Sequence, residues 1–141
     1  MFVSRHKIRF DDVDGAGIVY YPRYFHFCHK SFEDFFNERA EITYPTLINQ
    51  LGIGFPTVKI TSEFSKPLYY GDEIISHLSV SKIGQSSLDC TYQFFCVKDN
   101  SLCFSADIVV VCMDVAKKCS LSIPLNLRET FSRIMASRPG E

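Results

Sequence analysis

The chain has 141 residues, 46% of them hydrophobic and 14% aromatic, and its formal net charge is −1. This length predicts one domain with its own core, at residues 1–135, followed by a frayed tail at 136–141. The near-zero net charge argues against nucleic acid or an anionic membrane as the main partner. No apolar run approaches the ~18 residues of a membrane span, and the charged start MFVSRHKIRF lacks the apolar run of a signal peptide.

The cysteines form no CxxC pair, and no histidine lies at metal-ligand spacing from any of them, so no metal site is expected. An even number of cysteines is compatible with disulfides. The absence of a signal peptide instead favours reduced, mostly buried cysteines in a cytoplasmic protein. The six positions are Cys28, Cys90, Cys96, Cys103, Cys112 and Cys119.

The first predicted element is a half-exposed strand over residues 2–10. A loop at 11–19 follows, in which Gly15 and Gly17 permit backbone conformations closed to other residues. Pro22 then suits the first turn of a helix. Beyond it, the apolar residues fill about half of the helix circumference, which predicts one long amphipathic helix laid against a sheet. These residues are Tyr24, Phe25, Phe27, Cys28, Phe32, Phe35 and Phe36.

A short helix is predicted at 44–52, another at 124–135, and four strands between them. The strand connections are too short for parallel crossovers, so the pattern predicts an antiparallel sheet and an α+β layout. The last strand is apolar on both faces from Ile108, which predicts a central strand covered on both sides. One helix cannot provide that cover, so we expect a homo-oligomer. The strands are predicted at about 58–64, 74–81, 88–96 and 103–113.

The stretch FDDVDGAGIVYYPRY, at 10–24, places three acids and two glycines directly before the aromatic helix. A helix start presents unpaired backbone N–H groups, which can polarise a carbonyl oxygen and stabilise an oxyanion. A carboxylate beside it can act as a nucleophile or a general base, which suits acyl transfer or hydrolysis. From spacing alone, the acids can equally cap the helix and fill an acidic turn.

The longer stretch FDDVDGAGIVYYPRYFHFCHKSFEDFF, at 10–36, resembles the signature of the 4-hydroxybenzoyl-CoA thioesterase family. An Asp, a Gly, an aromatic pair and a long helix all match in register, and the length and strand order also fit. The resemblance implies the hot-dog fold, in which one long helix packs against a five-stranded antiparallel sheet that dimerises into a continuous sheet. The stretch looks most like the 1,4-dihydroxy-2-naphthoyl-CoA thioesterases of phylloquinone and menaquinone biosynthesis.

The resemblance also implies roles for particular residues. Asp14 would be the catalytic carboxylate, which attacks the thioester carbonyl or activates the water that does so. The backbone N–H near Tyr21 would bind the thioester oxygen, and Gly17 would let backbone and substrate approach closely. His29 stands where relatives acting on hydroxylated aryl groups reach the ring hydroxyl; relatives specific for 4-hydroxybenzoyl carry an acid there. Asp11 and Asp12 are interpreted as loop acids without a catalytic role.

Short-chain relatives carry a histidine immediately before the helix, where this chain has Tyr21, and this favours an aryl group held among Tyr20, Tyr24 and Phe25. In the turn at 81–87, the resemblance makes Lys82 and Ser86 the contacts for the phosphates of coenzyme A. Coenzyme A is part of the substrate, and no separate cofactor is expected. Each residue also has an ordinary alternative, since the aromatic residues suit a core and His29 and Lys82 suit a solvated surface.

The leading hypothesis is a cytoplasmic acyl-CoA thioesterase that assembles as a homodimer or homotetramer. One alternative is a thioesterase for other aryl or short-chain acyl groups, or for acyl groups on a carrier protein. Another is a non-catalytic acyl-CoA-binding module. A hot-dog dehydratase is disfavoured, because it needs a His paired with an acid beside a Pro-rich segment, and no proline of this chain flanks a histidine.

Overall fold

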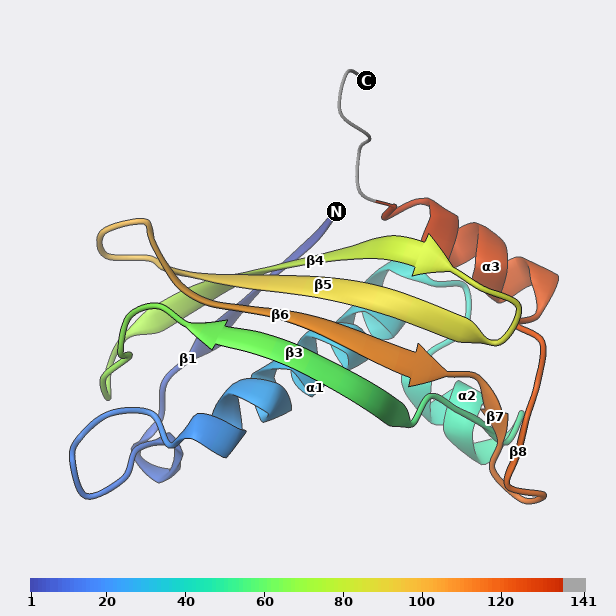
Figure 1. Ribbon diagram of the computed structural model, residues 1–141, viewed down its shortest axis with the longest axis horizontal. Helices are drawn as coiled ribbons and strands as arrows, with labels where there is room; N and C mark the ends of the chain where they lie inside the picture. Colours follow the sequence, from blue (N-terminus) through green and yellow to red (C-terminus); the bar gives the residue numbers. More distant parts are fainter. Residues whose placement is uncertain (136–141) are drawn as a thin grey trace.

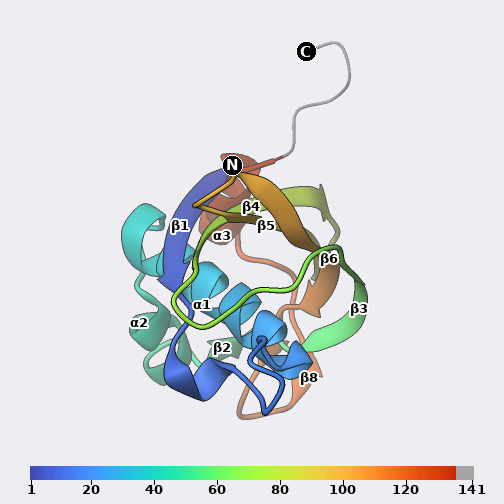
Figure 2. The same cartoon turned by 90° about the vertical axis from the view of Figure 1, so that its left-hand side faces the viewer.

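The computed structural model describes residues 1–135, in which a five-stranded antiparallel sheet curls around one long helix (Figure 1). Viewed end-on, α1 (Tyr21–Arg39) lies on the concave side of the sheet (Figure 2). This confirms the predicted α+β layout, and the predicted tail at 136–141 lies outside the described residues. The sheet order is β1–β4–β5–β6–β3, formed by β1 (Phe2–Lys7), β3 (Thr57–Phe64), β4 (Glu73–Ile83), β5 (Ser87–Cys96) and β6 (Ser101–Val111).

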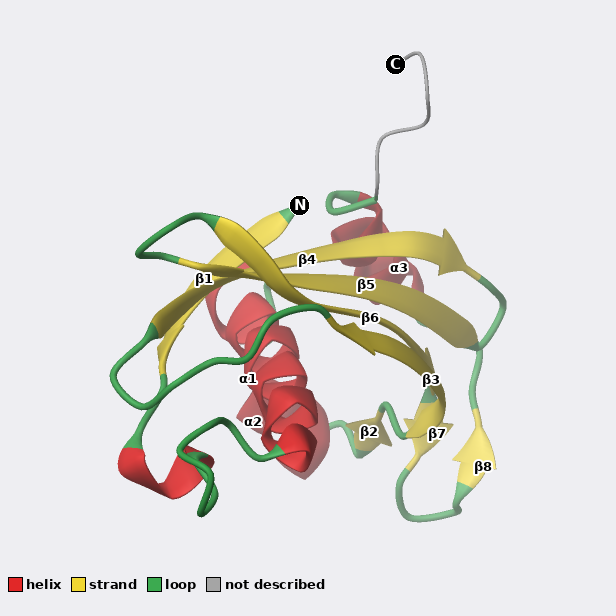
Figure 3. Cartoon of the chain, turned by 60° about the vertical axis from the view of Figure 1, so that its left-hand side comes forward, coloured by secondary structure: helices red, strands yellow, loops and turns green. Residues whose placement is uncertain are grey.

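Several short elements complete the chain (Figure 3). The predicted short helices are present but shorter, as α2 (Tyr44–Asn49) and α3 (Leu125–Ser132). The predicted last strand is interrupted at Cys112, whose N–H donates to the Ser86 carbonyl at 2.7 Å. None of the helices within residues 1–135 combines the length and apolarity that crossing a membrane requires. The unpredicted elements are η1 (Phe10–Asp12) and a second sheet of β2 (Ile53–Gly54), β7 (Met113–Asp114) and β8 (Cys119–Ser120).

The long helix α1 forms where the sequence predicts it, with Pro22 in its first turn. Its apolar side chains recur three and four residues apart, so they form one stripe that faces the sheet. Phe35 packs edge-on against Phe2 of β1, with ring centroids 5.7 Å apart, and truncating such a buried ring typically costs about 3–5 kcal/mol. The buried residues of the stripe are Tyr24, Phe27, Cys28, Ser31, Phe32, Phe35 and Phe36.

The strand β1 is shorter than predicted, and Phe10 does not join the core. The strand ends at Lys7, and the 3-10 helix η1 begins at Phe10. Asp12 fixes this turn, because its N–H donates to the Arg9 carbonyl at 3.0 Å and its Oδ2 accepts from the Arg9 N–H at 2.8 Å. Phe10 is therefore turned outward, with 77% of its surface exposed.

The cover of the sheet also differs from the prediction. The strand β6 is an inner strand, but Val109 and Val111 on its outer face are only half-buried. A group of exposed apolar residues lies instead on β3, an edge strand that pairs only with β6 among residues 1–135. Ile60 and Phe64 stand opposite the buried residues Ile108 and Phe104, so they face the helix side of the sheet, where α1 leaves both of them exposed. Val58 is exposed as well.

The cysteines are mostly buried, as predicted. Five of the six are buried, and Cys119, in the hairpin of β7 and β8, is exposed. Burial raises the pKa of the Cys90 thiol to about 12. A thiol with so high a pKa stays protonated and behaves as a small apolar side chain.

A small, partly buried polar cluster lies between β1 and α1. His6 Nε2 lies 3.1 Å from Ser4 Oγ and 3.2 Å from Ser31 Oγ. Ser31 Oγ donates in turn to Ser76 Oγ of β4 at 2.8 Å. Burial lowers the pKa of His6 below its ordinary value of 6.5, against the opposing effect of the Asp34 charge. The folded chain therefore favours the neutral imidazole.

We expect the free energy of unfolding to depend on pH through His6. Because the His6 pKa is lower in the folded chain, the unfolded chain binds this proton more tightly, and protonation favours unfolding. The His6 contribution is present above pH 6.5 and is lost as the pH falls from 6.5 through the folded-state pKa. Urea titrations between about pH 7.5 and about pH 5 should show a smaller loss of stability in His6→Gln than in the wild type. His29→Gln, at an exposed helix position, is the matched control, and an unchanged pH dependence in His6→Gln would contradict the prediction.

Candidate active site

The glycine-containing loop before α1 is a short hairpin. Val13 and Val19 pair antiparallel, and the Asp14 N–H donates to the Ile18 carbonyl at 2.9 Å. The Gly17 N–H closes the turn by donating to the Asp14 carbonyl at 3.0 Å. Gly17 has a φ of +81°, a left-handed conformation that favours glycine, whereas Gly15 has no positive φ. The predicted conformational role of glycine thus applies at Gly17 alone.

The carboxylate of Asp14 is exposed at the tip of this hairpin. Its Oδ1 accepts a hydrogen bond from the Ala16 N–H at 2.8 Å, which is the geometry of an Asx turn. Its Oδ2 has no hydrogen-bond or ion-pair partner among residues 1–135. Asp14 does not cap α1, whose N-cap residue is Tyr20. One carboxylate oxygen is therefore held by the loop and the other is free to meet a ligand.

The start of α1 leaves one backbone N–H free. The Val19 N–H donates to the Leu68 carbonyl at 2.8 Å, and the Tyr20 N–H donates to the Asp12 carbonyl at 2.9 Å. The backbone N–H of Arg23 donates to the Tyr20 carbonyl at 2.9 Å, and Pro22 has no N–H. The Tyr21 N–H has no acceptor within the described chain and points from the positive end of the helix dipole.

Asp12 anchors this loop, a role that the sequence did not reveal. Only 2% of Asp12 is exposed, and its Oδ1 accepts from Arg23 Nε at 3.0 Å and from Arg23 Nη2 at 2.8 Å. Asp11, which is exposed, lies 3.5 Å from the same guanidinium. The three acids of the loop therefore differ in environment, because Asp12 is buried and paired while Asp14 stays accessible. This agrees with the interpretation of Asp12 as a non-catalytic acid.

A shallow groove of about 280 Å³ opens beside the helix start. Tyr24 forms its inner wall and packs against Phe64 and Phe104, with ring centroids 5.0 Å and 4.9 Å away. Burial raises the pKa of the Tyr24 hydroxyl, so it stays protonated at neutral pH. The groove is lined by Ile18, Val19, Tyr21, Tyr24, Phe64, Ser65, Lys66 and Pro67.

Four of the residues predicted to hold the substrate do not line this groove, namely Gly17, Tyr20, Phe25 and His29. The Tyr20 ring is exposed and packs against the Tyr21 ring, with centroids 5.2 Å apart. His29 is exposed on α1 and lies against Tyr44 of α2, with ring centroids 5.8 Å apart. It lies eight residues beyond Tyr21, roughly 12 Å along the helix axis. The single chain therefore brings Tyr21 and Tyr24 together, but not Tyr20 and His29.

Lys82 and Ser86 lie at the opposite end of the sheet from the groove. Lys82 is near the end of β4, and Ser86 is in the turn before β5. Glu73, at the other end of β4, stands opposite Lys7 in the antiparallel register of β4 with β1. Lys7 is close to the Asp14 hairpin in the chain. Nine residues of strand separate Glu73 from Lys82, roughly 30 Å. In one chain these two residues are therefore remote from Asp14.

Phe64 and Lys66 line the groove but were not predicted as site residues. The alternation of residues 58–64 assigned Phe64 to a strand, and nothing local indicated that this strand would reach the helix start. Lys66 Nζ is held by Asp99 Oδ2 at 2.6 Å, so it is fixed at the rim of the groove. Only the pairing of β3 with β6 places both residues beside Tyr24.

The arrangement combines a free carboxylate oxygen, a free helix-start N–H and an aromatic groove. An N–H in this position can stabilise an oxyanion, and a carboxylate can attack a carbonyl carbon or deprotonate a water molecule. Among residues 1–135, no three His, Cys, Asp or Glu side chains gather in a way that would hold a metal ion. The geometry suits hydrolysis of an activated ester or thioester.

Comparison with known sequences points to the same chemistry. The model of the thioesterase-like superfamily matches residues 8–131. A 1,4-dihydroxy-2-naphthoyl-CoA hydrolase of Nostoc punctiforme is 26% identical over 130 residues, covering 87% of this chain and 81% of the relative. The enzyme of the same name from Prochlorococcus marinus is 30% identical over 131 residues, covering 87% and 83%. The resemblance to thioesterases inferred from the 10–36 stretch is thereby confirmed.

Solved structures confirm the predicted hot-dog fold. A 1,4-dihydroxy-2-naphthoyl-CoA thioesterase from Synechocystis superposes with a TM-score of 0.83 at 20% identity, covering 93% of this chain and 95% of that one. A gentisyl-coenzyme A thioesterase gives 0.83 at 26% identity, covering 92% and 99%. A 4-hydroxybenzoyl-CoA thioesterase mutant complexed with 4-hydroxybenzoyl-CoA gives 0.84 at 19% identity, covering 92% and 97%.

Substitution of Asp12 should destabilise the protein far more than substitution of Asp14. Asp12→Ala removes a buried partner of Arg23 and should lower the free energy of unfolding by about 3 kcal/mol. Asp14→Asn keeps an oxygen that can accept from the Ala16 N–H and should change stability by less than about 0.5 kcal/mol. Urea denaturation of the two variants beside the wild type measures both effects. Equal losses of stability in the two variants would contradict the assigned roles.

Proposed function

The chain belongs to the thioesterase-like superfamily, and from this premise we propose that it hydrolyses aryl-CoA thioesters. The first candidate substrate is 1,4-dihydroxy-2-naphthoyl-CoA, which would place the enzyme in phylloquinone or menaquinone biosynthesis. The observation that carries the proposal is that Asp12 anchors the loop whose Asp14 Oδ2 and the helix start whose Tyr21 N–H both lack a partner among residues 1–135. The names of the cyanobacterial relatives support the choice of substrate.

In the proposed reaction, the thioester oxygen accepts a hydrogen bond from the Tyr21 N–H, which stabilises the oxyanion as it forms. By one route, Asp14 attacks the carbonyl carbon and expels the coenzyme A thiolate, and water then cleaves the mixed anhydride. By the other route, Asp14 takes a proton from the water that attacks. Both routes consume one water and release a carboxylic acid and a thiol. Both also require the negative charge of Asp14.

The groove is the proposed place of the acyl group. Its wall of Tyr24 and Phe64 offers ring edges and faces to an aryl group, an arrangement that aromatic pairs favour. A volume of about 280 Å³ suits a small ring system better than a long alkyl chain. His29 could reach a ring hydroxyl only if the aryl group extended along α1, so this role stays a prediction. The same holds for Tyr20.

The exposed apolar side of β3 supports assembly into a homodimer. The edge of β3 carries backbone N–H and C=O groups with no partner strand, and Val58, Ile60 and Phe64 are exposed beside it. An edge strand of this kind is a template for pairing with another chain. We propose that two copies of β3 pair antiparallel, which would join the two sheets and bury these side chains.

Such a dimer would also bring Lys82 and Ser86 of one copy closer to the candidate active site of the other. Antiparallel pairing would place the Thr57 end of one β3 beside the Phe64 end of the other. The β4–β5 turn lies at the Thr57 end of the sheet, as the register from Thr57 through Val110 and Leu88 to Ile83 indicates. Lys82 and Ser86 of a second copy could then approach coenzyme A bound at the first. Their predicted contact with substrate therefore depends on the assembly.

A free-thiol release assay with a panel of thioesters tests the function. The panel contains dihydroxynaphthoyl, 4-hydroxybenzoyl, short-chain and long-chain acyl-CoA, and each is also offered to Asp14→Asn. We expect selective turnover of the naphthoyl ester, and a loss in Asp14→Asn of at least about a hundredfold, the scale of losing a general base. Binding of free coenzyme A should be retained in the variant, because its loop and fold remain intact.

The other outcomes separate the alternatives. Turnover of aliphatic esters alone would keep the thioesterase and discard the proposed pathway, and a preference for carrier-bound acyl groups would replace coenzyme A as the substrate carrier. Binding of acyl-CoA without hydrolysis under any condition would favour a binding module. A fully active Asp14→Asn would remove Asp14 from the mechanism.

Size-exclusion chromatography with light scattering tests the dimer. We expect the wild type to be dimeric at micromolar concentration and Ile60→Lys to be monomeric, because the substitution places a charge in the proposed interface. Val3→Lys is the matched control, since Val3 is an exposed apolar residue on the other edge strand, β1. It should leave the dimer intact. A monodisperse, active wild-type monomer would overturn the proposal.

A further inference from the structure

Another pocket, of about 260 Å³, lies toward the opposite end of α1 from the candidate active site. It forms where the start of β1, the last turns of α1 and the end of α3 meet, and Figures 1 and 2 both show the start of β1 beside the end of α3. Phe35 lies fourteen residues beyond Tyr21, roughly 21 Å along the helix axis, so this pocket is separate from the groove. We call it the arginine pocket, and its lining residues are Met1, Phe2, Phe35, Arg39, Thr130, Arg133 and Ile134.

The floor of the arginine pocket is apolar and belongs to the core. Only 1% of Phe2, 1% of Phe35 and 6% of Ile134 is exposed. The Phe35 ring packs against the rings of Phe2 and Phe131, with centroids 5.7 Å and 6.0 Å away. The Ile134 carbonyl accepts from the Val80 N–H of β4 at 2.9 Å, which ties the chain after α3 to the sheet. Because core packing holds this floor in place, the pocket exists before any ligand binds.

Two arginines stand at the rim of this pocket. Arg39 and Arg133 are exposed, and neither has a carboxylate within 4 Å among residues 1–135. Neither guanidinium donates a hydrogen bond to these residues, whereas Arg128 of α3 donates to the Gln85 carbonyl at 3.1 Å. The Arg39 guanidinium lies 6.0 Å from the centroid of the Phe2 ring, so it is close to the apolar floor. No acid lines the pocket, so its charged side chains are both cations.

The helix ends explain why each of these positions is basic, but not why both charges border one pocket. Arg39 is in the last turn of α1, and Arg133 is the C-cap residue of α3. A cation near the end of a helix interacts favourably with the helix dipole. That effect needs one charge near each end and sets no direction for the side chain. Here the two helix ends converge, and both guanidinium groups flank the same apolar floor.

The chemistry of the lining selects a carboxylate attached to a small apolar body. A guanidinium presents parallel N–H donors that match the two oxygens of a carboxylate, and such charge-assisted pairs are stronger than neutral hydrogen bonds. Inorganic phosphate would satisfy the charge but leave the apolar floor uncovered. A pocket of about 260 Å³ has room for a small ring system and not for a long chain.

We propose that the arginine pocket binds a small carboxylate whose apolar body is a ring system. Arg39 and Arg133 bind the carboxylate, and the ring lies on Phe2 and Ile134. The site does not depend on the proposed thioesterase function, because none of its residues lines the groove or belongs to the Asp14 loop. A ligand of this class has two sources, which are the acid released by the proposed hydrolysis and an aryl acid from another reaction.

Calorimetric titration of the full chain with benzoate tests the site. We expect saturable binding with a Kd of about 0.1 mM, the scale for a ligand of about nine heavy atoms. Arg39→Gln and Arg133→Gln should each weaken this binding at least about tenfold, the scale of losing a charged hydrogen-bond partner. Lys66→Gln is the matched control, since it removes a cation from the groove instead, and it should leave benzoate binding unchanged.

Two further probes separate the charge from the ring. Benzamide has the ring without the charge, and inorganic phosphate has a charge without the ring. Each should bind at least about tenfold more weakly than benzoate, because each lacks one of the two contacts. Equal binding of benzamide or of phosphate would overturn the proposal. So would the absence of saturable benzoate binding up to about 10 mM.

The variants also separate the proposal from a role of the arginines at the helix ends alone. If Arg39→Gln and Arg133→Gln lower the free energy of unfolding but keep wild-type benzoate binding, the proposal falls. Binding that is lost in Lys66→Gln instead would place the anion in the groove and would also overturn it. Arginine-dependent benzoate binding in a protein that hydrolyses no thioester would support the site while the proposed function falls.

The source of the ligand is tested by titrating 1,4-dihydroxy-2-naphthoate beside benzoate. Tighter arginine-dependent binding of the naphthoate would support the site and identify the acid released by the proposed reaction as its ligand. Tighter arginine-dependent binding of benzoate would support the site and assign it to an acid from another reaction. Both arginine variants should keep the wild-type kcat and KM for acyl-CoA, because the pocket lies apart from the candidate active site.

Discussion

The buried pair of Asp12 and Arg23 is the interaction on which the functional region depends. It joins the end of η1 to the first turn of α1, and Asp12 also binds the Arg9 backbone. A carboxylate with so little exposure requires such partners, because an unpaired buried charge is costly. With Asp12 fixed, the hairpin that follows presents Asp14 to solvent, and the helix starts with a free N–H at Tyr21. One ion pair thus organises the surroundings of the proposed reaction.

A second constraint is the width of the sheet relative to its single helix. The helix α1 buries the helix-facing side of the inner strands, but it contacts the edge strand β3 at Phe64 and leaves the rest of that strand exposed. Ile60 and Phe64 therefore remain exposed on a side that is core in the neighbouring strand. The same overhang leaves the Phe64 ring available to the groove beside Tyr24. The shortage of cover that favours a second copy of the chain also shapes the proposed acyl site.

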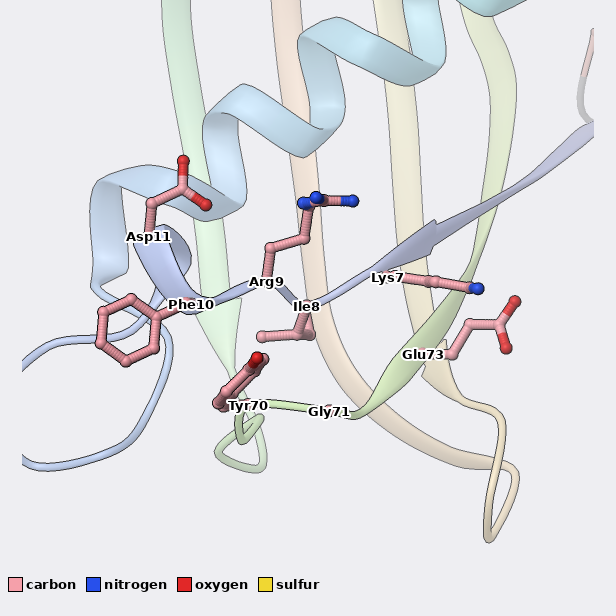
Figure 4. Close-up of a pocket in the computed structure, with 8 residues that line it drawn as sticks. All are labelled: Lys7, Ile8, Arg9, Phe10, Asp11, Tyr70, Gly71 and Glu73. Carbon is pink, nitrogen blue, oxygen red and sulfur yellow. The ribbon is translucent and has the colours of Figure 1, made fainter.

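The two segments that flank the helix start link these features. Residues 8–21 and 64–71 are tied by the Ile18–Tyr69 bridge and by the hydrogen bond from Val19 to Leu68. Between them they form the wall of the groove on one stretch and, on the next, part of the wall of a hollow of about 620 Å³ (Figure 4).

The sequence by itself determined the local features of this protein. Spacing of three and four residues encoded the buried stripe of α1, and the Asp-Gly-Ala-Gly run encoded the turn of residues 14–17, because both depend on neighbours in the chain. The tertiary structure decided which of these features meet. Phe10 faces outward because Asp12 binds the Arg9 backbone and is itself held by Arg23, eleven residues later. Phe64 lies against Tyr24 because of the register of β3 on β6. Lys82 lies at the far end of the sheet because of the register of β4 with β5. A local pattern fixes the face on which a side chain lies, whereas long-range pairing fixes what that face meets.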